Sequence, residues 1–87
     1  MAIVFIPAQL QSLTGGVKQT PVEAATVGEA VRLLDEQFPG IRARLCRDDE
    51  LAPGLQVSID HAVSGQGLLA RLRPDSEVHF LPAIGGG

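Results

Sequence analysis

The sequence is poor in aromatic residues, because it contains three phenylalanines but neither tryptophan nor tyrosine. Its seven Lys and Arg residues are outnumbered by ten Asp and Glu, which gives a formal net charge of −3. Nucleic-acid-binding domains typically combine a basic surface with aromatic side chains on which bases stack. The composition therefore argues against nucleic acid as a partner. The composition fits better with a mildly acidic protein that docks on basic surfaces of its partners.

The chain also has little cysteine, since Cys46 is its only one. A single cysteine cannot form an intramolecular disulfide, and it cannot supply a multi-cysteine zinc or iron–sulfur site. No histidine lies near Cys46 in the sequence to activate a thiolate. We therefore predict a small, half-buried apolar residue at this position rather than a nucleophile.

Long hydrophobic runs are missing as well. The longest apolar run near the N-terminus covers residues 2–6, which is far too short for a signal peptide or a membrane span. We expect a cytoplasmic protein that makes no membrane contact. With 87 residues and 45% apolar content, the chain predicts one domain over residues 1–87.

One amphipathic helix is clearly encoded. Thr26 and Glu29 have the spacing of a capping box, in which each side chain satisfies a backbone amide at the helix start. Apolar residues then recur at helical spacing on a single stripe. These residues are Val27, Ala30, Val31, Leu34 and Phe38. Pro39 biases the residue before it out of the helical region, so the helix should end there.

The remaining pattern predicts strands separated by turns. Residues 2–6 and 17–23 should form a hairpin across the turn Thr14-Gly15-Gly16, with residues 9–13 as a polar connection and Pro21 on an edge strand. Residues 41–46 add a helical turn, and residues 47–50 are a solvated loop rather than a metal site. Strands follow at residues 55–60, 62–63 and 77–82, with Leu55, Val57 and Ile59 facing the core.

This order of strand, strand, helix, strand, short strand, strand predicts an α+β fold. A helix that crosses back over a hairpin covers one face of a mixed sheet of four to five strands. The right-handed crossover rule then places the first and last strands in parallel at its centre.

The chain ends on Gly85-Gly86-Gly87, directly after the last predicted strand. Glycine at a terminus has nothing to pack, so residues 84–87 should form a flexible tail. The tail is either a frayed end or a working group, in which the Gly87 carboxylate threads into a partner site too narrow for side chains.

The element order with a diglycine terminus resembles the ubiquitin-like β-grasp sulfur carriers of the MoaD/ThiS family. The family includes the small subunit of molybdopterin synthase, the thiamin-thiazole sulfur carrier and CysO, whose subgroup is the most similar. The resemblance covers essentially the whole chain. The segments that carry it are Ile6-Pro7, Thr14-Gly15-Gly16, Thr26-Val27-Gly28-Glu29-Ala30, Phe38-Pro39-Gly40-Ile41, Arg73-Pro74-Asp75-Ser76-Glu77-Val78 and Leu81-Pro82-Ala83-Ile84-Gly85-Gly86-Gly87. Two departures are Gly85, where the family often has alanine, and Arg73-Pro74-Asp75, where it usually has Asp-Gly-Asp.

The resemblance implies a carrier rather than an enzyme. In the family, an E1-like adenylating enzyme uses ATP to activate the C-terminal carboxylate, here that of Gly87 beside Gly86. A persulfide or sulfide donor then converts it to a thiocarboxylate, which a synthase accepts as a sulfur source for cysteine, molybdopterin or another metabolite. No cofactor is bound by the carrier itself. Two alternatives stay open: a ubiquitin-like modifier conjugated through the same terminus, and a non-catalytic interaction module.

A partner-binding face can be placed from strand alternation. If Val78 and Phe80 face the core, then His79 and Leu81 point outward beside Ile3 and Phe5, and form an apolar patch next to the tail. The predicted partner-binding set is completed by Pro82, Ile84 and Gly85. The opposite assignment, with Phe5 in the core, is the alternative. His61 and His79 lie far apart in the sequence and show no metal-ligand pattern, and we expect them to be surface or network residues.

Overall fold

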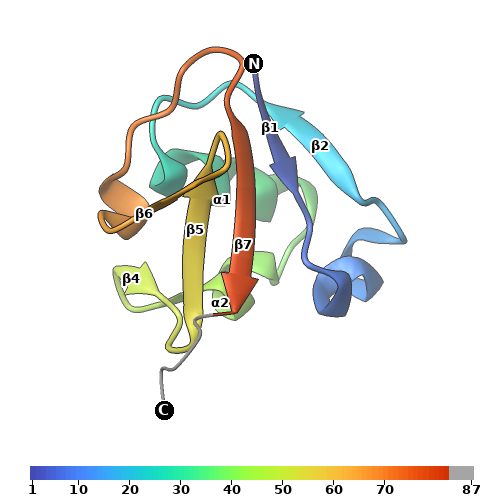
Figure 1. The fold of residues 1–87 in the computed structure, drawn as a ribbon. Coiled ribbons are helices and arrows are strands. Elements are labelled where there is room, and N and C mark those ends of the chain that lie inside the picture. Colours follow the sequence, from blue (N-terminus) through green and yellow to red (C-terminus); the bar gives the residue numbers. More distant parts are fainter. Residues whose placement is uncertain (83–87) are drawn as a thin grey trace.

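The structure is a computed structural model, and it describes residues 1–82. Its main sheet has five strands in the order β2–β1–β7–β5–β6 (Figure 1). Those strands are β1 (Ala2–Phe5), β2 (Gln19–Val22), β5 (Leu55–Ile59), β6 (Ala62–Ser64) and β7 (Glu77–Pro82). The predicted α+β arrangement is confirmed, including the bounds of the last strand.

β7 occupies the centre of the sheet. It pairs in parallel with β1 and antiparallel with β5, while β2 and β6 are the two edges. The predicted parallel pairing of the first and last strands is therefore confirmed. Pro21 lies on the edge strand β2, as expected for a residue without an amide hydrogen.

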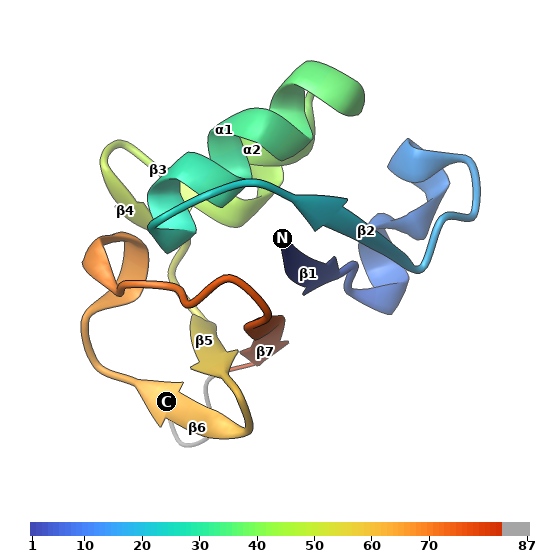
Figure 2. The same cartoon turned by 90° about the horizontal axis from the view of Figure 1, so that it is seen from above.

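The main helix α1 (Val27–Gln37) covers one face of the sheet together with the short helix α2 (Ile41–Leu45) (Figure 2). The Thr26 hydroxyl accepts a hydrogen bond from the Glu29 N–H at 3.2 Å, and the Glu29 carboxylate accepts one from the Ala25 N–H at 2.9 Å. The predicted capping box is thus confirmed, with Glu29 reaching back to residue 25.

The core lies between these helices and the sheet. Val4, Val57 and Val78 are fully buried from the sheet side, and Leu34 and Ile41 from the helix side. Burying such side chains contributes about 1.5–3 kcal/mol each, which makes this contact the main source of stability. Phe38 caps the C-terminal end of α1 and is only partly buried.

Two connecting segments are more regular than the sequence predicts. Residues 9–13 lie within a 3-10 helix, η1 (Ala8–Thr14), rather than in a polar connection. Pro7 precedes it with φ of −55°, and Gly15 ends it in the left-handed region at 67°. Leu10, which belongs to this 3-10 helix, is buried in the core, and its burial explains why this largely polar segment packs against the domain.

Residues 47–50, predicted as a solvated loop, contain the turn of a small hairpin. Its strands are β3 (Cys46–Arg47) and β4 (Glu50–Leu51). Asp48 adopts a positive φ of 58°, which a short side chain that bonds its own backbone tolerates. Arg47 lies directly opposite Glu50, and opposite charges at paired positions favour this register.

The turn between β5 and β6 contains only Asp60 and His61. Both have positive φ, 51° and 73°, as a two-residue type I′ hairpin requires. Further along, η2 (Gly67–Leu69) packs against the start of α1, where Gly28 lies so close to Leu68 that an added Cβ would be 3.2 Å from its carbonyl oxygen. Among residues 1–82, no helix has the length and apolar character needed to cross a membrane.

Candidate functional site

The two faces of β7 are divided as the sequence predicts. Val78 and Phe80 are buried against the helices, whereas His79 and Leu81 lie on the opposite face and are half-buried. On β1, Val4 is fully buried and its neighbours Ile3 and Phe5 share the outer face. The alternative assignment, with Phe5 in the core, is therefore wrong.

The outer face brings two predicted binding residues into direct contact. Phe5 and His79 are paired across the parallel strands, and their rings stack with centroids 4.1 Å apart and an angle of 10° between planes. Because each ring covers part of the other, the patch is half-buried rather than fully exposed. Ile3 lies opposite Glu77 and Leu81 opposite Gln56, so polar side chains border the apolar ones.

A third ring adjoins this pair, and sequence reasoning missed it. The ring of His61 lies 6.2 Å from that of His79, tilted by 32°, and His61 Nε2 is 3.8 Å from Glu77 Oε1. The two histidines are therefore surface residues, as predicted, but they are also neighbours on one face, which the sequence did not indicate. A tight turn at Asp60 and His61, short enough to hold His61 beside β7, is the signal that would have placed them together.

The start of β7 is fixed by Asp60. Its Oδ1 accepts the Glu77 N–H at 2.9 Å, and its Oδ2 accepts the Ser76 hydroxyl at 3.1 Å. Ser76 Oγ in turn accepts the Arg73 N–H at 2.8 Å. The Glu77 amide holds the pKa of the Asp60 carboxyl below its usual value, with smaller contributions from Ser76 and the nearby Arg73 charge. The predicted turn at residues 73–76 is thereby tied to the β5–β6 hairpin.

At its other end, β7 leads to the predicted tail. Pro82 is exposed, pairs with Leu55, and accepts a hydrogen bond from the Gln56 side chain at 3.4 Å through its carbonyl oxygen. The remaining predicted site residues lie outside the described part of the chain, so their roles stay predictions. They are Ile84, Gly85, Gly86 and Gly87, and with them the expected flexibility of residues 84–87.

Cys46 does not lie on the outer face of the sheet. Cys46 is 7% exposed and belongs to the core, so it is more buried than the predicted half-buried position. Burial raises the pKa of its thiol, against a smaller lowering effect of the Arg42 charge. Over residues 1–82, no three His, Cys, Asp or Glu side chains are grouped so that they could hold a metal ion.

The sequence profile of the ThiS family matches residues 4–87. The chain belongs to the ThiS family. A comparison with the sequences of curated proteins found no significant match.

Solved structures agree with this assignment. A chain from the crystal structure of the Amycolatopsis orientalis BexX/CysO complex is 32% identical, with a TM-score of 0.88 and full coverage of both chains. Mycobacterium tuberculosis CysO, described as an antigen, is 25% identical, with a TM-score of 0.86 over 97% of this chain and 100% of that one. SAMP1 from Haloferax volcanii shares the fold at 24% identity, with a TM-score of 0.77 over 99% and 98% of the two chains. The fold is therefore the ubiquitin-like β-grasp of the sulfur carriers.

Proposed function

We propose that this protein is a sulfur carrier that works through the carboxylate of Gly87 in the cytoplasm. One observation carries the proposal: the family match extends through Gly87, and Gly87 is only the fifth residue after the end of the central strand β7. The carrier supplies an acyl group, and its partners supply the catalysis. It is therefore a co-substrate rather than an enzyme.

The chemistry follows from the poor reactivity of a carboxylate. An E1-like adenylating enzyme joins the Gly87 carboxylate to the α-phosphate of ATP and releases pyrophosphate, which gives the acyl carbon a good leaving group. Sulfide then attacks that carbon and displaces AMP, leaving a thiocarboxylate. If a persulfide attacks instead, the acyl disulfide that forms is cleaved by a thiol. The carrier itself binds no cofactor in this scheme.

Glycine at the last three positions suits this step. An extended segment spans at most about 3.3–3.6 Å per residue, so the five residues after Pro82 reach about 17 Å from the domain. A partner can therefore enclose the terminus in a narrow channel while the folded domain stays outside. We propose that Gly85 and Gly86, which have no side chains, occupy this channel of the partner, and that Ile84 contacts the channel entrance.

The outer face of the sheet is the docking surface in this proposal. His79 and Leu81 on β7, the strand that leads to the tail, and Phe5 on the neighbouring β1 offer half-exposed apolar and aromatic groups, with Ile3 and Pro82 at the borders of the patch. Aromatic side chains at the centre of such a patch contribute strongly to binding. An E1-like enzyme that contacts this face would receive the tail at a fixed distance.

We further infer that a synthase accepts the sulfur, for cysteine, molybdopterin or another sulfur-containing metabolite. The support is the 32% identical relative, whose structure was determined in a complex of BexX with CysO. The likeness to SAMP1, at 24% identity, supports the fold alone.

Intact mass spectrometry tests the proposal. The full chain is incubated with the adenylating enzyme encoded in the same genome, ATP and sulfide. The expected result is a mass gain equal to the difference between a sulfur and an oxygen atom, located at Gly87. A variant that lacks Gly86 and Gly87 should keep the fold and show no gain. An unchanged mass, or a gain that survives the deletion, would contradict the proposal, and ladders of conjugated proteins would identify a modifier instead.

A further inference from the structure

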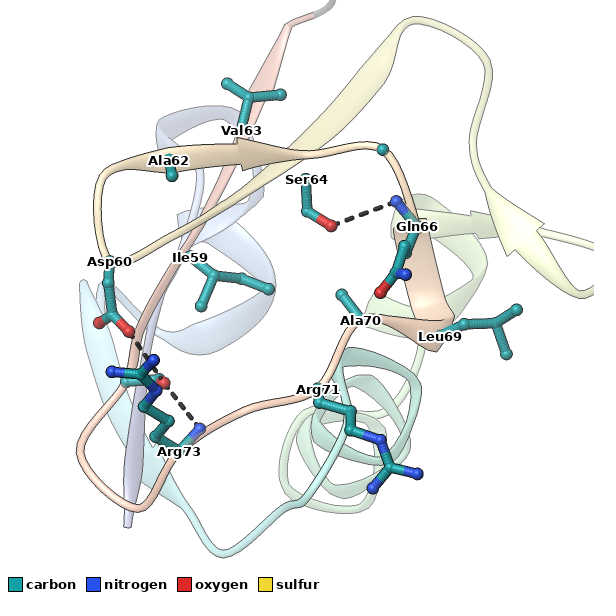
Figure 3. A pocket seen from close by; sticks show the side chains of 12 residues that line it. Ile59, Asp60, Ala62, Val63, Ser64, Gln66, Leu69, Ala70, Arg71 and Arg73 are labelled. Carbon is teal, nitrogen blue, oxygen red and sulfur yellow. Dashed lines mark hydrogen bonds between the residues drawn. The ribbon is translucent and has the colours of Figure 1, made fainter.

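A groove lies at the edge of the sheet farthest from β2, away from the outer face. It has a volume of about 880 Å³ and separates the β5–β6 hairpin from the segment that follows η2 (Figure 3). Its volume falls in the range typical of ligand sites. Ser64 and Gln66 close one end, where the Gln66 N–H donates to the Ser64 hydroxyl at 3.2 Å.

One wall of the groove is the open edge of β6. In the two-residue hairpin Ile59 and Ala62 form the hydrogen-bonded pair next to the turn, so the next pair, Ser58 and Val63, is not hydrogen-bonded. The N–H and C=O of Val63 therefore point away from β5, toward the free edge. No strand pairs with this edge in the described part of the chain.

The opposite wall presents a second open edge. Arg71 forms an isolated antiparallel bridge with Thr26, whose two hydrogen bonds join the neighbouring residues: Val27 N–H to Ala70 C=O at 3.0 Å and Leu72 N–H to Ala25 C=O at 2.8 Å. In this geometry the N–H and C=O of Arg71 itself point away from the start of α1. Arg71 lines the groove, so its main chain faces β6 across it.

The side chains around the groove are apolar and basic. Val63 is 59% exposed and Leu69 82% exposed, two of the five large hydrophobic side chains that are exposed among residues 1–82. Arg71 and Arg73 belong to the other wall, from which the Arg71 side chain extends away from β6 (Figure 3), and neither guanidinium makes an ion pair with any residue from 1 to 82. Among residues 1–82, the Asp60 carboxylate is the only acidic group that lines the groove, and it already accepts two hydrogen bonds.

We propose that this groove binds an extended acidic peptide segment of a partner protein, which adds as a strand between β6 and the main chain of Arg71. The peptide would hydrogen-bond Val63 on one side and Arg71 on the other, as strand addition to a sheet edge does. Its apolar side chains would contact Val63 and Leu69, and its carboxylates would contact Arg71 and Arg73.

Charge selects this occupant over a second copy of the chain. The groove carries two arginines against one carboxylate, whereas the whole chain has a net charge of −3 and would repel itself. The groove also lies away from the end of β7 that leads to the tail, because Asp60, Arg73 and Ser76, which line it, are at the start of that strand. A partner could hold the groove while the tail reacts elsewhere.

A titration of the full chain with a seven-residue peptide of alternating glutamate and valine tests the proposal. Amide chemical shifts in a ¹H–¹⁵N spectrum should change most at Val63 and Arg71, and binding should saturate and weaken as salt is added. The same peptide with lysine in place of glutamate should bind at least about tenfold more weakly. A glutamate peptide N-methylated at alternate residues, which cannot donate hydrogen bonds on one edge, should also lose binding.

Charge-reversal variants supply matched controls. Arg71→Glu with Arg73→Glu should weaken binding by about tenfold or more, whereas Arg42→Glu with Arg44→Glu, which changes the net charge equally, should have less than a twofold effect. If the first double variant does not fold, Leu69→Asp at the 82% exposed position replaces it and should also weaken binding.

Four results would overturn the proposal. The first three are the absence of saturable binding, binding of the lysine peptide as tight as that of the glutamate peptide, and chemical-shift changes centred on the outer face or on β2. The fourth is a set of shifts at Val63 and Arg71 that depends on protein concentration without peptide, because it would identify a second copy of the chain as the occupant. The mass assay for thiocarboxylate formation needs no peptide, so failure of the sulfur-carrier function would be seen separately.

Discussion

Two phenylalanines on opposite faces of the same sheet allow the docking surface to be separated from the core. Phe80 is 6% exposed and packs beneath the helices, so Phe80→Ala should destabilise the domain by about 3–5 kcal/mol. A domain of this size has a total stability of roughly 4–13 kcal/mol, so this loss is a large fraction of it. Phe80→Ala should therefore be marginally folded.

Phe5→Ala should behave differently. Phe5 is only half-buried, and its main partner is the ring of His79 at 4.1 Å. Losing an aromatic pair removes about 0.5–1.5 kcal/mol beyond the area that is exposed, so we expect a total destabilisation of about 1–2 kcal/mol. The variant should remain folded at 25 °C and should give a spectrum like that of the parent protein.

Charging by the adenylating enzyme should nevertheless be strongly impaired. Truncation of an aromatic side chain at the centre of an interface typically costs about 2 kcal/mol or more, which corresponds to roughly a thirtyfold higher KM for the carrier. The kcat should change little, because the tail that reacts is intact. Urea denaturation and initial rates of pyrophosphate release measure the two effects.

Either of two outcomes would refute this reasoning. If Phe5→Ala loses as much stability as Phe80→Ala, the outer ring is part of the core and the assigned faces are wrong. If KM is unchanged in a folded Phe5→Ala variant, the adenylating enzyme does not bind this face. Arg44→Ala, at an exposed position of α2 on the helix-covered side of the sheet, should leave both quantities unchanged and serves as the control.

Two further predictions concern the ends of α1 and β7. Thr26→Ala removes the hydroxyl that accepts the Glu29 N–H and should lower stability by about 1 kcal/mol in urea denaturation, whereas Thr26→Asn should restore most of it; equal stability of all three proteins would contradict the observed cap. The folded-state pKa of Asp60 is depressed, so its contribution is present above its unfolded pKa and is lost as the pH falls through its folded pKa. The midpoint of thermal unfolding should therefore fall less steeply on acidification in Asp60→Asn than in the parent protein, and identical slopes would show that the carboxylate does not stabilise the start of β7.

The main features of the fold follow from local patterns in the sequence. The stripe from Val27 to Leu34 specifies a helix with one buried side, and the alternation in residues 77–82 specifies which side chains of the last strand face outward. Both predictions were confirmed because one face of each element is buried, and burial of one face leaves a regular hydrophobic period. The capping box at Thr26 was equally predictable from the sequence, since its two hydrogen bonds join residues that are close together in the chain.

Features that depend on contacts between distant segments were not predicted. The 3-10 helix η1 forms because Leu10 reaches the core, and a sequence pattern does not show that reach. The neighbourhood of His61 and His79 depends on a two-residue turn made by non-glycine residues in the left-handed region, which is uncommon. The groove beside Val63 was not predicted from the sequence either, because its other wall is formed by Arg71, which is held by the bridge to Thr26.

In the proposed function, the position of β7 links docking to the reaction. Its outer-face residues His79 and Leu81 lie on the same strand that ends at Pro82, and pairing with both β1 and β5 holds that strand in place. A partner that binds the outer face therefore fixes the point from which the tail starts, and the five residues that follow set how far Gly87 can reach. The edge strand β6 pairs with β5 and not with β7, and the groove beside it adjoins the start of β7 rather than its end at Pro82, so the proposed acidic peptide segment would bind away from the tail.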